Sequence, residues 1–238
     1  MRFAAGRPPP EEEVMTTDYR NYRIENSARR GEDIEWSTFY IYNNLDEHSF
    51  RVALIGDSIC NGYQGALRER LARRANIAFW ASSYCVTDPA YLPLLTAFLD
   101  RVRPGLIVFN NGLHCFTSDP GQWSAAYSLT ARYLVDRFPS ARVVLLNSTP
   151  LREDSGGKVA RINKMTAAAA EQLRLPLIDF YSECDRFDRS QWRDNYHFSP
   201  EAIRHQADFL AAALAPYLPG NGDLEQRSTA TGPSGALA

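Results

Sequence analysis

A serine near residue 60 and a histidine near residue 200 stand in surroundings that suit nucleophilic attack and proton transfer. Ser58 directly follows a short apolar run, residues 52–55, that is closed by Gly56 and Asp57. His197 follows Asp194 by three positions. Serine, histidine and aspartate are the parts of a nucleophile, its general base and the group that orients the base. If the fold brings them together, these side chains could cleave an acyl bond.

The surroundings of Ser58 are typical of a buried strand that ends in a turn and leads into a helix. Residues 52–55 are short and apolar, and Leu67 and Leu71 are spaced to share one face of a helix. Parallel sheets build their sites at the carboxyl ends of strands, and a helix N-terminus there offers free N–H groups to a developing oxyanion. The competing interpretation is that Ser58 only caps the helix.

Strands and helices alternate along the chain, which predicts an α/β fold with helices on both faces of a parallel sheet. After the first strand, which ends at Gly56, we expect four more at residues 76–83, 106–109, 142–146 and 175–180. The helices after Leu71 are expected at residues 88–102, 122–138, 158–173 and 200–214. The prediction is a three-layer α/β/α sandwich around a five-stranded parallel sheet.

The motifs at the two ends resemble those of the SGNH/GDSL hydrolase superfamily. Gly56-Asp57-Ser58-Ile59 is similar to its first block, and Asp194-x-x-His197 is similar to its last. The resemblance spans about residues 51–214 and implies a flavodoxin-like sandwich and a serine esterase. It implies Ser58 as the nucleophile that carries the acyl group, His197 as the base and Asp194 as its orienter.

The resemblance also implies an oxyanion hole, with the Ser58 N–H as one donor. The family's second block places a glycine in the loop after the second strand, and the N–H of that glycine is another donor. Here Ser83 occupies the matching place. A backbone donor needs no glycine side chain, but glycine often permits the required φ.

The third block, normally Gly-x-Asn-Asp, matches the loop after residue 109 in two registers. Aligning Gly112 with the motif glycine puts His114 in the asparagine position and Cys115 in the aspartate position. Aligning the strand ends instead offers Asn110 or Asn111 as the side-chain donor, and all these groups can supply an N–H. We favour the Gly112/His114 register over a purely packed, hydrogen-bonded loop histidine.

The cysteines show no C-x-x-C pairing, and the chain begins without a recognisable signal peptide, so we expect reduced thiols in a cytoplasmic protein. Cys60, Cys85 and Cys115 map to the same sheet edge as His114, which makes a zinc site a minor alternative. A Cys60 nucleophile is a further alternative. We predict no metal and no cofactor.

The chain has 238 residues, which suits one domain with extensions. The domain is expected at residues 51–217, with 18–50 packed on it as an extra strand or loop and with 1–17 and 218–238 disordered. Residues 33–36 could lie near the site, but we favour a packing role for them. The net charge of −2 and the lack of a long apolar run predict neither a nucleic-acid nor a membrane partner.

The expected substrate is a small-molecule or carbohydrate ester. No long apolar lid is visible in the sequence, which favours a short acyl group such as acetyl on a polar alcohol or sugar. An acyltransferase would use the same residues. The altered second and third blocks also suit a non-catalytic binding module, and the loop at residues 56–62 suits a phosphate site. A phosphate site, however, has no need of the Asp194 and His197 pair.

Overall fold

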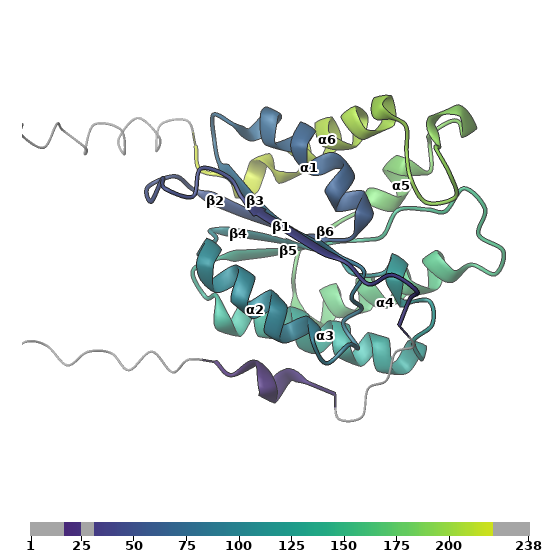
Figure 1. Ribbon diagram of the computed structural model, residues 1–238, viewed down its shortest axis with the longest axis horizontal. Coiled ribbons are helices and arrows are strands. Elements are labelled where there is room, and N and C mark those ends of the chain that lie inside the picture. The colour runs from purple at the N-terminus through teal and green to yellow at the C-terminus, as the bar shows by residue number, and fades with distance from the viewer. Residues whose placement is uncertain (1–16, 25–30, 221–238) are drawn as a thin grey trace, which may run out of the picture.

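A six-stranded sheet forms the centre of the computed structural model, which describes residues 17–24 and 31–220 (Figure 1). The strands are β1 (Ser37–Ile41), β2 (Arg51–Gly56), β3 (Asn76–Ser82), β4 (Leu106–Phe109), β5 (Arg142–Leu146) and β6 (Leu177–Ile178). Their order is β1-β3-β2-β4-β5-β6, and β2 to β6 are parallel. The five predicted parallel strands are confirmed. The sixth strand, β1, comes from the N-terminal extension and pairs antiparallel with β3.

Helices cover both faces of the sheet, which confirms the three-layer sandwich (Figure 1). One face carries α1 (Ser58–Leu71), α5 (Phe180–Cys184) and α6 (Pro200–Leu214), and the other carries α2 (Tyr91–Val102), α3 (Pro120–Arg137) and α4 (Lys158–Leu173). Short 3-10 turns are η1 (Tyr19–Tyr22), η2 (Leu113–Cys115), η3 (Arg189–Gln191) and η4 (Ala215–Tyr217). Within the described ranges, no helix combines the length and apolarity that a membrane span requires.

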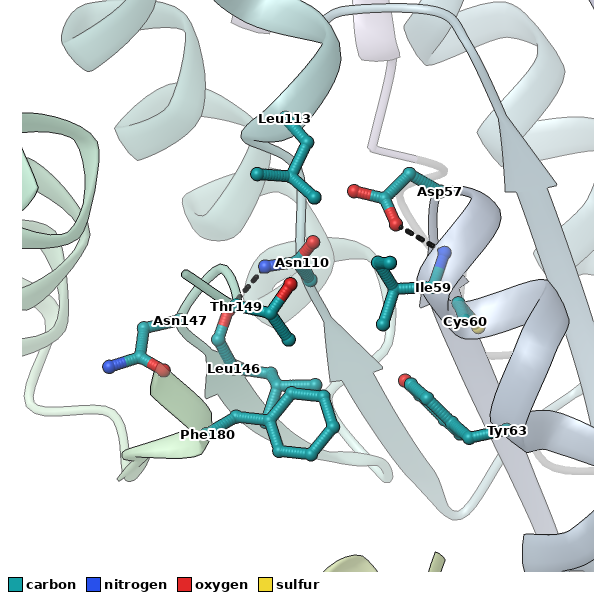
Figure 2. Close-up of a pocket in the computed structure, with 10 residues that line it drawn as sticks. All are labelled: Asp57, Ile59, Cys60, Tyr63, Asn110, Leu113, Leu146, Asn147, Thr149 and Phe180. Atoms are coloured by element: carbon teal, nitrogen blue, oxygen red, sulfur yellow. Dashed lines mark hydrogen bonds between the residues drawn. The ribbon is translucent and has the colours of Figure 1, made fainter. Parts of the chain in front are cut away.

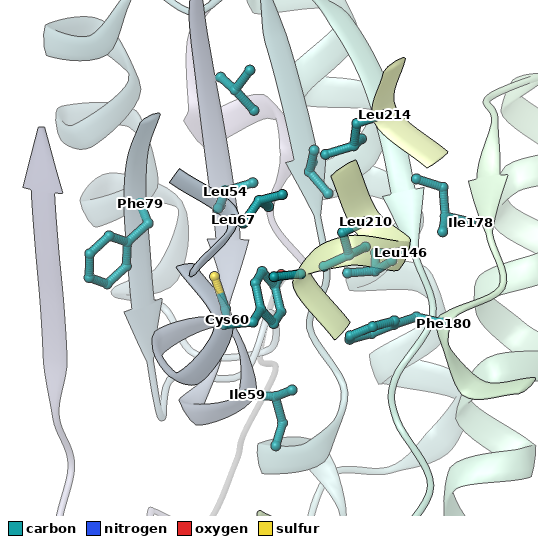
Figure 3. Close-up of a cluster of buried hydrophobic side chains, with 14 of the residues drawn as sticks. Leu54, Ile59, Cys60, Leu67, Phe79, Leu146, Ile178, Phe180, Leu210 and Leu214 are labelled. Carbon is teal, nitrogen blue, oxygen red and sulfur yellow. The ribbon is translucent and has the colours of Figure 1, made fainter. Parts of the chain in front are cut away.

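The strands read as continuous apolar runs because both faces of the sheet are covered. Leu54 of β2 is 1% exposed and belongs to the same buried cluster as Leu67 of α1 and Leu210 of α6 (Figure 3). A second cluster lies on the other face, between the sheet and α2 and α3. Each such leucine contributes about 1.5–3 kcal/mol by leaving water. The two clusters fix the strand ends on which the site is built.

The strand predicted at 175–180 is shorter than expected, because β6 ends at Ile178. The side chain of Asp179 accepts hydrogen bonds from the Ser182 N–H and from the Asn147 amide, and it caps α5, which starts at Phe180. A capping aspartate ends the extended backbone that the apolar sequence alone would continue.

The described residues of the N-terminal segment contact α3 and β3. In η1, the Tyr22 ring meets the Tyr133 ring of α3 edge-on at 5.3 Å, and its hydroxyl bonds to Asp136 at 2.8 Å. β1 supplies the extra strand, with Phe39 opposite Trp80 of β3.

The disorder predicted for the two chain ends falls mostly on residues 1–16 and 221–238, which lie outside the described residues. Leu218 is 7% exposed and belongs to the core, so the packed domain continues past the predicted boundary at 217.

Candidate functional site

The turn between β2 and α1 presents Ser58 at the carboxyl end of the central strand. Asp57 caps α1, because its Oδ1 accepts the Ile59 N–H at 2.9 Å. Gly56 is required there, since a Cβ would lie 2.7 Å from the Cβ of Cys60. The interpretation of Ser58 as the helix cap is therefore wrong. Asp57 performs that role and leaves the Ser58 hydroxyl available for another partner.

A short hairpin before α6 presents His197. The Arg193 N–H donates to the His197 carbonyl oxygen at 2.8 Å, and an isolated bridge pairs Trp192 with Phe198. The rings of Trp192 and Phe198 lie 4.3 Å apart. α6 then starts at Pro200 with Ser199 as its cap. The imidazole is thus held between a closed turn and a capped helix.

The structure brings Ser58, His197 and Asp194 into one chain of hydrogen bonds. The His197 Nε2 lies 2.9 Å from the Ser58 Oγ, and the His197 Nδ1 lies 2.8 Å from the Asp194 Oδ2. A carboxylate only accepts, so the Nδ1 carries the proton and the Nε2 can take one from the serine. Asp194 therefore meets the imidazole directly across the three-residue turn.

Asp194 is held ionised by its own turn. Burial opposes ionisation, but the N–H groups of Tyr196 and His197 donate to the carboxylate and the imidazole lies beside it. The net result lowers the pKa of Asp194 from 3.8 to about 2. The orienting group keeps its charge over the whole pH range in which an imidazole titrates.

A small cavity of about 10 Å³ lies between the Ser58 turn and the ends of β4 and β5 (Figure 2). Asp57 and Ile59, which flank Ser58 in sequence, line it from one side, and Asn110 and Thr149 line it from the other. This volume is room for about one water molecule. Ser58, His197 and Asp194 are not among the residues that line the cavity.

The predicted role of the Ser83 N–H in the oxyanion hole is contradicted. This N–H donates to the Trp36 carbonyl oxygen at 3.0 Å, and Ser83 is fully buried. The donor is therefore occupied by the backbone that leads into β1.

Both polar atoms of the Asn111 side chain also have partners outside the predicted oxyanion hole. Its Oδ1 accepts the Val86 N–H at 3.0 Å, and its Nδ2 donates to the Tyr84 carbonyl oxygen at 2.9 Å. With 5% of its surface exposed, Asn111 joins the loops after β3 and β4, which corrects its predicted role as a donor. Asn110 donates to the Leu146 carbonyl oxygen at 2.8 Å and so ties β4 to β5.

His114 lies in η2, directly after β4 and Gly112. Its Nδ1 lies 2.9 Å from the Glu32 Oε1, and its side chain is 18% exposed. Gly112 is needed for this register, because a Cβ there would collide with the side chain of Ser148. The role of His114 as an oxyanion donor stays a prediction.

Solved structures share this architecture. They include the aryl esterase of M. smegmatis, with 16% identity over 71% of this chain and 100% of that one, at a TM-score of 0.58. A GDSL-like lipase from Bacteroides thetaiotaomicron matches with 15% identity over 74% of this chain and 88% of that one, at 0.54. A family two carbohydrate esterase from Clostridium thermocellum matches with 16% identity over 70% and 63%, at 0.56. The chain has the SGNH/GDSL hydrolase fold.

The resemblance in sequence is therefore confirmed at the level of the SGNH fold. Neither a protein-family model nor a curated protein matches the chain by sequence. This agrees with the two altered blocks, because only short segments around Ser58 and His197 keep the family pattern.

The expectation of four reduced thiols is wrong for two of them. Cys85 and Cys115 form a disulfide between the loop after β3 and η2, so neither offers a thiolate to zinc. Cys60 and Cys184 are free and buried. Burial raises the pKa of the Cys60 thiol to about 12, which makes it a poor alternative to Ser58 as a nucleophile.

A packing role was predicted for residues 33–36. Glu35 and Trp36 bond to Ser83, and Glu32, in the same segment at residues 31–36, bonds to His114. The spacing of two glutamates before a tryptophan was the signal available, and nothing in it specifies these partners.

Proposed function

We propose that the protein is a serine ester hydrolase in which Ser58, His197 and Asp194 form the catalytic triad. The continuous hydrogen-bond chain from the Ser58 hydroxyl through His197 to Asp194 carries this proposal. The SGNH fold, shared with lipases and esterases, supports the same reaction class.

In the first half of the reaction, the Ser58 Oγ attacks the ester carbonyl carbon while the His197 Nε2 takes its proton. The oxyanion forms near the Ser58 N–H, which has no carbonyl partner within α1 because Ser58 is the first helical residue. As the C–O bond breaks, His197 returns the proton to the leaving alcohol, and the acyl group stays on Ser58.

In the second half, water replaces the alcohol. His197 takes a proton from the water, the hydroxide adds to the acyl carbon, and the ester bond to Ser58 breaks with proton return to the Ser58 oxygen. The products are a carboxylic acid and free enzyme. Asp194 stays ionised throughout and stabilises the imidazolium that forms twice.

The substrate class we propose is a short acyl ester, such as an acetyl ester, of a carbohydrate or another polar alcohol. The sequence shows no long apolar lid, which favours a short acyl group. The fold shared with a carbohydrate esterase is compatible with a sugar alcohol.

The test is hydrolysis of p-nitrophenyl esters from acetate to longer chains, with Ser58→Ala beside the parent and Ser182→Ala as a matched serine control. We expect acetate to be preferred and activity to be lost only in Ser58→Ala. A fluorophosphonate probe should label the parent once, on Ser58. Activity that survives Ser58→Ala would refute the triad.

Acyl transfer is the neighbouring reaction, because an alcohol can replace water in the second half without any change of residues. Product analysis in the presence of glycerol or a free sugar separates the two outcomes. A folded parent that neither hydrolyses esters nor takes up the probe would instead support a binding module.

A further inference from the structure

The hairpin that carries His197, residues 192–198, is fastened to the fold at its tip as well as at its base. At the base, Trp192 pairs with Phe198, which belongs to the buried cluster against which Trp192 packs. At the tip lies Asn195, a half-buried residue inside the three-residue turn. The motif that identifies the hairpin leaves this position unspecified, so the role of Asn195 has to come from its contacts.

Asn195 binds the main chain of the loop that follows β5, residues 147–157. Its Oδ1 accepts the Glu153 N–H at 2.8 Å, and its Nδ2 donates to the Glu153 carbonyl oxygen at 3.3 Å. Its own carbonyl oxygen accepts the Arg152 N–H at 3.0 Å. Three hydrogen bonds therefore join one residue of the hairpin to two neighbouring residues of the loop.

The loop is itself tied to α4, so it offers the hairpin a fixed support. The carboxylate oxygens of Asp154 accept the N–H groups of Lys158 and Val159, in the first turn of α4, at 3.0 and 3.1 Å. Nearer to β5, the Asn163 side chain of α4 bonds to both the N–H and the carbonyl oxygen of Ser148, each at 2.8 Å. The loop is thus held on both sides of the residues that Asn195 binds.

The contact between His197 and Ser58 depends on where the hairpin lies. The His197 Nε2 is 2.9 Å from the Ser58 Oγ, which is inside the range of about 2.6–3.2 Å that proton transfer requires. These two residues are 139 positions apart, whereas Asp194 shares the hairpin with His197. A shift of the whole hairpin would therefore lengthen the contact with Ser58 and leave the contact with Asp194 intact.

We propose that Asn195 is a positioning residue that sets the distance from His197 to Ser58 by clamping the hairpin to the loop after β5. This rests on the proposed ester hydrolysis. Asp194 and His197 are held to each other within the hairpin, and the clamp decides only where the hairpin as a whole lies. Without it, the tip can pivot about the base at residues 192 and 198.

The test is Asn195→Ala, measured by kcat and KM on p-nitrophenyl acetate. The variant keeps the main-chain bond to Arg152 and loses both side-chain bonds to Glu153. A misplacement of about 1 Å between reacting groups can cost 10²-fold, so kcat should fall roughly 10- to 100-fold while KM stays near the parent value. Labelling of Ser58 by a fluorophosphonate should slow by a similar factor, because it needs the same proton transfer.

Two further readouts separate a change of position from a change of charge. The N–H groups that hold the Asp194 carboxylate belong to the hairpin itself. The acid limb of the kcat/KM profile, which reports the base, should therefore stay at the parent pH in Asn195→Ala. Asn195→Asp keeps an oxygen that can accept the Glu153 N–H, so its kcat should lie above that of Asn195→Ala.

Asn76→Ala is the matched control for the loss of an asparagine clamp. The Asn76 side chain also makes two hydrogen bonds, to Asn43 at 2.7 Å and to Asp46 at 2.9 Å. It begins β3 beside Arg51, at the sheet edge opposite the one that carries Ser58. We expect Asn76→Ala to lower the midpoint of urea unfolding and to keep kcat at the parent value.

Three results would overturn the proposal while leaving the triad intact. The first is a parent kcat in Asn195→Ala. The second is an equal loss of kcat in Asn76→Ala, which would mean that general loosening of the fold is responsible. The third is a displaced acid limb in Asn195→Ala, which would mean that Asn195 acts on the charge of the base. If Ser58→Ala keeps the parent activity, or the parent has none, the proposed hydrolysis itself fails and this role falls with it.

Discussion

The two halves of the site are held by different kinds of contact. In the triad half, Asp194 and His197 belong to one short hairpin, and Ser58 begins a helix directly after the central strand. In the oxyanion half, His114 depends on the segment at residues 31–36 and on a disulfide between loops. The groups proposed to move protons are held by local structure, and the predicted oxyanion donor His114 is held by contacts between distant parts of the chain.

The largest loss is expected in the triad half, from His197→Ala. Without the imidazole, the Ser58 hydroxyl has no base, and kcat should fall by roughly 10⁴–10⁶-fold. Initial rates on p-nitrophenyl acetate measure this loss. His205→Ala, in the middle of α6, is the matched histidine control and should keep the parent rate. Loss of a general base lowers the rate by far more than 10-fold. A His197→Ala variant whose kcat lies within 10-fold of the parent value would therefore contradict the triad.

Asp194→Asn should lower kcat by roughly 10²–10⁴-fold. The asparagine oxygen can still accept the N–H groups of Tyr196 and His197, so the turn persists. Its NH₂ group then faces the His197 Nδ1 and selects the wrong tautomer. Asp208→Asn, which alters a surface ion pair with Arg70, is the control for loss of a carboxylate. Equal rates in both variants would show that the backbone alone orients the imidazole.

Breaking the disulfide should lower the stability of the fold and should lower kcat through the oxyanion half rather than the triad half. Cys85 and Cys115 close a loop with a sequence separation of 30, and removing such a link costs about 3–4 kcal/mol of unfolding free energy. Cys85→Ser should show this loss in urea unfolding, and its kcat should fall because Cys115 follows His114 directly. A dithiol reductant should mimic the variant in the parent and change nothing in Cys85→Ser. A reductant effect of equal size in Cys85→Ser would point to another target.

The same contrast explains how much could be predicted from the sequence. The Ser58 turn, four of the strands and the start of α6 follow from short runs of neighbouring residues, and the structure has them where they were predicted. Asp194 and His197 are three residues apart, so their meeting needs only one turn. β6 is shorter than the predicted strand because apolar periodicity does not reveal the capping bonds of Asp179.

The oxyanion half was beyond prediction for a physical reason. The partners of Ser83 and His114 lie 48 and 82 residues away, and no spacing rule links them. Family analogy suggested the Ser83 N–H as a donor, yet its hydroxyl and N–H instead anchor Glu35 and Trp36. Pairing of Cys85 with Cys115 likewise depends on β3 and β4 both flanking β2.

Ser83→Ala tests the anchor of the oxyanion half with a smaller expected effect. It removes the hydroxyl that bonds to Glu35 and Trp36, and the unsatisfied groups should cost about 1–3 kcal/mol of unfolding free energy. Ser82→Ala is the matched control, because the buried Ser82 hydroxyl has no hydrogen-bond partner among the described residues. Urea unfolding measures both variants. Equal costs for the two would mean that the Ser83 hydroxyl is not a specific anchor.

The smallest effect we predict returns to the triad half and concerns acid stability. The pKa of Asp194 is lowered from 3.8 to about 2 in the folded protein, so its ionisation stabilises the fold above the unfolded value and this contribution is lost as pH falls toward 2. The gap in unfolding free energy between the parent and Asp194→Asn should be constant above about pH 5 and should narrow between pH 4 and 2. Urea titrations at half-unit pH steps measure it, with Asp33→Asn as the control on an exposed carboxylate outside the triad. A gap that is still constant at pH 2 would mean that the local N–H groups do not hold this charge, and the triad half would then be no more self-contained than the oxyanion half.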